Sequence, residues 1–209
     1  DVPYPVFVYS GLVIWQLFAS SLSAASNSVV GNGSIITKVY FPRLIVPISA
    51  MGTAVVDFVM ACGMLGVLMW WYNVPPGWGL LFLPIPVFLC IITSVGFGCM
   101  ISALNVSFRD FRYTIPFLVQ LWLFATPTVY MTLSDASSSQ VSHSTYGFLK
   151  TFLIYCNPMT AIVGAFRAAI IGQPVSATML WAAVSMAIAS LLAGLALFRR
   201  FESRFADIV

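Results

Sequence analysis

The chain has 209 residues, of which 60% are hydrophobic and 7% are charged, with a mean hydropathy of +0.98. A soluble domain carries about 25% charged residues, so this composition excludes an ordinary water-facing surface and indicates a single membrane domain over residues 1–209. The net charge of +3 fits membrane topology and lipid contact rather than a nucleic-acid partner, and the four cysteines lack disulfide-framework or metal-site spacing.

Five apolar stretches are long enough to cross a bilayer core as helices of about 20 residues. They run at residues 6–26, 46–70, 79–104, 113–131 and 176–198. Seven of the nine lysines and arginines fall in alternate connections, at 27–45, 105–112 and from 199 onward. The positive-inside rule therefore predicts an all-α polytopic protein that starts outside and ends in the cytoplasm. An odd number of crossings, without a starting Met or a signal peptide, suggests that an N-terminal piece precedes residue 1.

The first inner connection contains an amphipathic pattern. Ile35, Ile36, Val39 and Tyr40 share one helical face, and Pro42 ends the pattern, so a short helix over about 32–43 is expected. This segment is either a membrane-surface loop or a docking helix for a cytoplasmic partner.

The second stretch contains a carboxylate, Asp57, about a third of the way along. An acid at that depth costs several kcal/mol unless it is paired or hydrated. It therefore serves a transport path, makes a structural hydrogen bond, or lies near the inner leaflet.

The next inner loop is short and dense in charge, with Arg109, Asp110 and Arg112. These side chains could bind lipid phosphate, pair with one another or fix the helix ends.

The fourth stretch combines Pro116 and Pro127 with a mid-depth polar residue, Gln120. Two prolines imply a kink or a broken helix, which is tolerated where the freed carbonyls meet other helices or water. The rings here form a stripe that is either core, lipid-facing or cavity-lining; it includes Phe117, Trp122, Phe124 and Tyr130.

The only long connection, 132–175, lies on the outer side and contains two apolar pieces too short to cross, about 147–156 and 159–171. Asn157-Pro158 separates them, and both are expected to be re-entrant or interfacial helices. Arg167 in the second piece either extends to the interface or caps a path for an anionic substrate.

Together these segments resemble the permease subunit of ABC-2 type polysaccharide exporters, the transporters of O-antigen, capsule and teichoic acid. The resemblance covers nearly the whole chain in order and spacing. It is carried by Phe18 to Asn27, Ile36 to Arg43, Val56 to Phe58, Asn105 to Arg112, Pro116-Phe117, Gln120 to Trp122, Asn157 to Arg167 and Arg200 to Asp207.

The resemblance implies six spanning helices, of which five are present here, and an inner-membrane permease that works as a homodimer with two copies of a separate ATPase. ATP and Mg would be bound by that ATPase, since the chain contains no P-loop sequence and needs no cofactor of its own. The substrate would be a lipid-linked glycan.

The same resemblance assigns roles to the candidate residues. The helix at 32–43 would couple to the ATPase, Arg109 and Arg112 would meet the head group, and Asn157, Pro158 and Arg167 would belong to an outer gate. Substrate-path residues would be Phe117, Gln120, Trp122, Phe124 and Tyr130. The coupling residues would be Ile35, Ile36, Lys38, Tyr40, Phe41 and Arg43.

Two rival functions share parts of this pattern. An ABC-2 exporter of a small hydrophobic or drug-like substrate would have the same architecture. An intramembrane enzyme acting on lipid-linked sugars would need clustered acids or a histidine at the interface, and the chain offers only Asp57 and an isolated His143.

Overall fold

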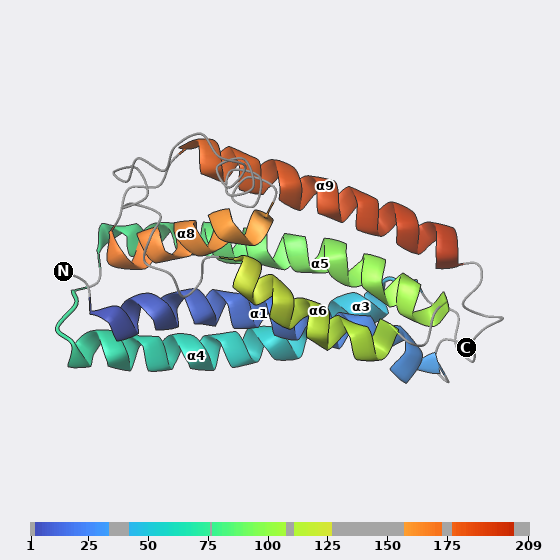
Figure 1. Ribbon diagram of the computed structural model, residues 1–209, viewed down its shortest axis with the longest axis horizontal. Helices are drawn as coiled ribbons and strands as arrows, with labels where there is room; N and C mark the ends of the chain where they lie inside the picture. Colours follow the sequence, from blue (N-terminus) through green and yellow to red (C-terminus); the bar gives the residue numbers. More distant parts are fainter. Residues whose placement is uncertain are drawn as a thin grey trace, which may run out of the picture.

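The computed structural model describes residues 3–33, 42–75, 77–107, 111–126, 157–172 and 177–202. Every regular element among them is helical, which confirms the all-α prediction, and Figure 1 shows the long helices running roughly along one common direction. The elements are α1 (Tyr4–Gly31), α3 (Ile45–Ala50), α4 (Gly52–Trp71), η1 (Trp78–Phe82), α5 (Pro84–Ser107), α6 (Phe111–Ala125), α8 (Pro158–Ile171) and α9 (Ala177–Glu202).

Four helical segments in the described residues are long and apolar enough to cross a membrane: Tyr4–Gly31, Ile45–Trp71, Gly79–Val106 and Leu180–Phe201. They coincide with four of the five predicted spans, and the first continues five residues beyond its predicted end. The fifth prediction, 113–131, corresponds to α6, which has 15 residues and ends at Ala125. Residues 127–131 lie outside the described part of the chain.

The two ends of the bundle differ in chemistry. Trp70 and Trp71 close α4 and are exposed, whereas Arg199 and Arg200 occupy the last turn of α9. Figure 1 places these two helix ends at opposite ends of the molecule. An aromatic belt at one end and cations at the other is the distribution expected of a membrane bundle.

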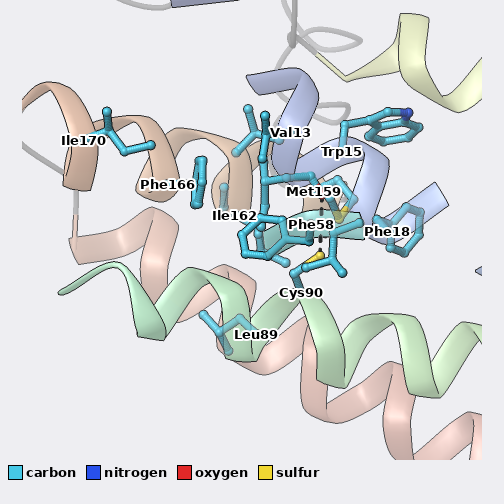
Figure 2. Packing of buried hydrophobic residues seen from close by; sticks show 14 of the residues in the cluster. Val13, Trp15, Phe18, Phe58, Leu89, Cys90, Met159, Ile162, Phe166 and Ile170 are labelled. Carbon is cyan, nitrogen blue, oxygen red and sulfur yellow. Dashed lines mark hydrogen bonds between the residues drawn. The ribbon is translucent and has the colours of Figure 1, made fainter. Parts of the chain in front are cut away.

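Helix α1 is the centre of the packing. More than half of its residues are buried, and it contacts α3, α4, α5, α6 and α8. Figure 2 shows side chains of this core converging from several helices, among them Phe18, Phe58, Cys90 and Phe166. The Cys90 thiol even reaches the carbonyl oxygen of Ile14 at 3.8 Å, so α1 and α5 lie very close together.

Glycines allow α5 and α9 to touch backbone to backbone. A Cβ added at Gly96 would lie 2.5 Å from the carbonyl carbon of Ser190, and one added at Gly194 would collide with the backbone of Gly96. Small residues at helix crossings permit this approach in membranes, where van der Waals packing drives association. Gly98 is also tightly packed, because an added Cβ would meet Ala25 and Met51.

Helix α8 confirms the predicted short helix at 159–171 and lies inside the bundle. Twelve of its residues are buried, and it packs on α1, α5, α9 and η1. This burial favours the re-entrant alternative over a helix lying on the membrane surface. The helix ends at Gly172, whose φ of 76° is a left-handed conformation that glycine adopts without strain. The companion piece at 147–156 lies outside the described residues.

Replacing Gly194 by Leu should destabilise the bundle by about 3 kcal/mol, because the added side chain must force two helix backbones apart. Thermal unfolding of the purified protein in detergent would show a lower midpoint. The matched control is Gly63→Leu on α4, where a Cβ meets nothing within 4 Å. Equal midpoints for both variants would contradict the close crossing.

Candidate substrate groove

A polar stripe follows one face of α1. Gln16, Ser20, Ser23 and Asn27 are spaced by four, three and four residues, which keeps them on one side of a helix with 3.6 residues per turn. They line a groove of about 860 Å³ between α1, α4 and α6. The facing wall consists of Pro116, Val119, Gln120 and Leu123 of α6, and Ala61 contributes from α4.

The groove is nearly as long as a bilayer core is thick. Its wall on α1 extends from Tyr9 to Asn27, and 18 residues at ~1.5 Å rise give about 27 Å against a hydrocarbon thickness of about 30 Å. Gln16 and Gln120 are both exposed to it. Because amides facing lipid would lose their hydrogen bonds, a groove of this kind must contain water or a polar ligand.

Hydrogen bonds within the stripe leave both donors and acceptors available. Gln16 Nε2 donates to Ser20 Oγ at 3.0 Å, and Asn27 Nδ2 donates to the carbonyl oxygen of Ser23 at 3.1 Å. Asn27 Oδ1 is buried and accepts no hydrogen bond from any described residue. A ligand with hydroxyl groups could therefore satisfy Asn27 Oδ1 and bond to the Ser20 hydroxyl.

The predicted substrate-path residues lie in different places. Gln120 lines the groove, whereas Phe117 and Phe124 are exposed on the outside of α6. Trp122 faces the core, and Tyr130 lies outside the described residues.

Trp122 belongs to an aromatic cluster at the centre of the bundle. Its ring meets Phe18 and Phe97 edge to face, with centroids 5.2 Å and 5.1 Å apart. Its indole N–H donates to Asn157 Oδ1 at 3.1 Å. Such edge-to-face pairs add about 0.5–1.5 kcal/mol to the burial of the rings, so Trp122 joins α6 firmly to α1 and α5.

Asn157 connects the end of α6 to the start of α8. Its Oδ1 also accepts from the backbone N–H of Met159, which caps α8, and its Nδ2 donates to Thr126 Oγ1 at 2.7 Å. We call Trp122, Thr126 and Asn157 the α6–α8 clasp. Asn157 and Pro158, predicted to belong to an outer gate, are both buried at the first turn of α8.

Arg167, the third predicted gate residue, is only 4% exposed. Its guanidinium carbon lies 3.9 Å from the ring centroid of Phe7, near the N-terminus of α1. A cation over an aromatic face is stabilised by the ring quadrupole, more strongly when desolvated. Within the described bundle the side chain is therefore packed against α1 rather than extended to the interface.

Asp57 is exposed on α4 and is not one of the residues that line the groove. It precedes Ala61, a groove residue, by four positions, so the two are neighbours on one face of the helix. It is 13 residues from Trp70, or about 20 Å along the helix, which places it well below the aromatic belt.

The remaining predicted residues lie mostly beyond the described chain. Among the coupling residues, only Arg43 is described, half-buried in the turn before α3. Arg112 is in the first turn of α6, and Arg109 lies outside the described residues. The others outside are Ile35, Ile36, Lys38, Tyr40 and Phe41.

The polar stripe itself was missed by reasoning from the sequence. None of Gln16, Ser20, Ser23 and Asn27 was among the predicted site residues. The four-three-four spacing of amides and hydroxyls was the signal that could have identified the stripe.

Replacing Asn157 by Ala should cost about 2–3 kcal/mol, because it removes a helix cap and two buried side-chain hydrogen bonds. Chemical unfolding in mixed micelles would measure this loss. Trp122→Phe, which removes only the indole donor and part of the ring area, should cost less. In a double-mutant cycle the two changes should be non-additive, and strict additivity would contradict the clasp.

No family model matches the chain. Among curated proteins, the O-antigen export system permease protein RfbA of Myxococcus xanthus is 25% identical over 209 residues, covering 99% of this chain and 76% of the relative. A protein of the same name from Klebsiella pneumoniae is 26% identical over 210 residues, with the same coverage. The similarity extends along nearly the whole chain, and the helical membrane bundle agrees with it, so the chain is similar to O-antigen export permeases.

Proposed function

We propose that this chain is the membrane-spanning permease subunit of an ABC transporter that exports a lipid-linked, O-antigen-like polysaccharide across the inner membrane. The observation that supports this most directly is the polar groove along α1, which offers a glycan a lined route through an otherwise apolar bundle. The names of the relatives point to the same class of substrate.

The groove suits a polysaccharide that must slide along it. The hydrogen-bonded pair Gln16 and Ser20 on α1 and the amide of Gln120 on α6 present a few hydrogen-bonding groups, and Tyr9 adds aromatic surface beside them. Weak, repeated contacts let each sugar leave one set of partners as it meets the next, whereas one tight site would stall the chain. The polarity of the stripe favours a glycan over a small hydrophobic substrate.

The energy for export comes from a separate ABC ATPase, which would bind ATP and Mg. Two ATPase copies and a second permease copy would complete the transporter, with the basic end of the bundle and the C-terminus on the cytoplasmic side. The segment 32–43 would receive the movement of the ATPase, and Arg109 and Arg112 would bind the head group of the lipid carrier. The relatives are named as transport permeases rather than as sugar-transferring enzymes.

Replacing both Gln16 and Gln120 by Leu should lower polysaccharide export at least several-fold, because the groove then loses its two exposed amides. Export is measured as glycan appearing on the far side of vesicles that contain the whole transporter. The control, Met60→Leu with Met64→Leu on the outside of α4, should export normally. Undiminished export by the glutamine variant would reject the groove as the path.

Replacing both Tyr40 and Arg43 by Ala should weaken ATPase association and export together, because the proposed docking segment loses a ring and a cation. Co-purification with the ATPase and export in vesicles measure the two effects. Lys150→Ala, on the predicted outer side, is the control. Unchanged association and export in the double variant would exclude docking at this segment.

A further inference from the structure

The lining of the groove is uncharged. None of its residues in the described part of the chain is Asp, Glu, Lys, Arg or His. The polar groups that remain are amides and hydroxyls, on Gln16, Ser20, Ser23, Asn27 and Gln120. A polymer carrying charge along its length would have to lose water here without gaining an ionic partner from this lining.

The available acceptor oxygens in the groove also favour a neutral sugar over an acidic one. Asn27 Oδ1 is a buried acceptor, and the bond from Gln16 Nε2 to Ser20 Oγ leaves Gln16 Oε1 as another acceptor. A sugar hydroxyl can donate to either oxygen. A carboxylate or phosphate cannot donate to these oxygens, and the N–H and O–H donors of Gln16, Ser20 and Gln120 offer it only neutral partners.

Asp57 adds a charge of the same sign as an acidic sugar near the groove. Its position one helical turn from Ala61 places it beside the route on α4. In a narrow groove beside apolar side chains, two like charges are screened less than in bulk water and therefore repel more strongly. A neutral hydroxyl passing the same point can instead donate a hydrogen bond to the carboxylate.

We propose that this permease selects electrically neutral glycan chains and that Asp57 is a specificity-determining residue that rejects acidic ones. This inference rests on the proposed function, because it assumes that the groove is the path. It gives Asp57 a role that hydrophobic packing does not explain, since the residue lies on the outside of α4.

The test compares two polymers of equal length on the same lipid carrier, one of neutral hexoses and one containing uronic acids. Vesicles with the complete transporter should export the neutral polymer about tenfold faster or more. Asp57→Asn, which keeps the shape of the side chain and removes its charge, should raise the ratio of acidic to neutral export. Asp57→Glu, which keeps the charge, should retain the preference.

Each other outcome is decisive. Equal export of both polymers by the unaltered protein would overturn the selectivity while leaving the proposed function intact. An unchanged ratio in Asp57→Asn would overturn the role of Asp57. Failure of the unaltered transporter to export either polymer would overturn the proposed function, and the selectivity with it.

Discussion

Helix α1 is apolar on one side and polar on another, and the arrangement of the other helices depends on this. One side carries Phe18 and its neighbours into the core, where α4, α5 and α8 pack around them. Another side carries amides and hydroxyls that cannot face lipid without a hydrogen-bonding partner. A helix of this kind is stable in a membrane only if the bundle covers its apolar side and leaves a wet channel along its polar side. The groove therefore follows from where the other helices pack.

Helix α6 has residues that face two different environments, the core and the groove. Trp122 is held inside by two rings and by Asn157, whereas Gln120 opens onto the groove. The same short helix thus supplies core packing on one side and path chemistry on another. The α6–α8 clasp holds the C-terminal end of α6 close to Gln120, so the width of the groove at Gln120 depends on this contact.

Hydropathy and charge were sufficient to predict four spans and the position of the short helix α8 in the sequence. These features follow from hydropathy and from the distribution of Lys and Arg, both averaged over many residues. The thickness and the apolar interior of the bilayer constrain both quantities strongly. The direction in which individual side chains point was harder to predict. Helix α6 has large apolar residues on all sides, so periodicity could not show that Trp122 points inward and Phe124 outward. The partners of Trp122 and Arg167 also come from distant segments that no local pattern connects to them. Asn157 accepts the hydrogen bond from Trp122, and the Phe7 ring lies under the Arg167 guanidinium.

The crossing at Gly96 and Gly194 limits which parts of the molecule can move. With no side chains between them, α5 and α9 cannot slide or separate without losing a backbone-to-backbone contact along their closest approach. We therefore expect α5 and α9 to move as one rigid body during a transport cycle. A displacement of the end of α9 that carries Arg199 and Arg200 would therefore also displace the opposite end of the α5–α9 pair.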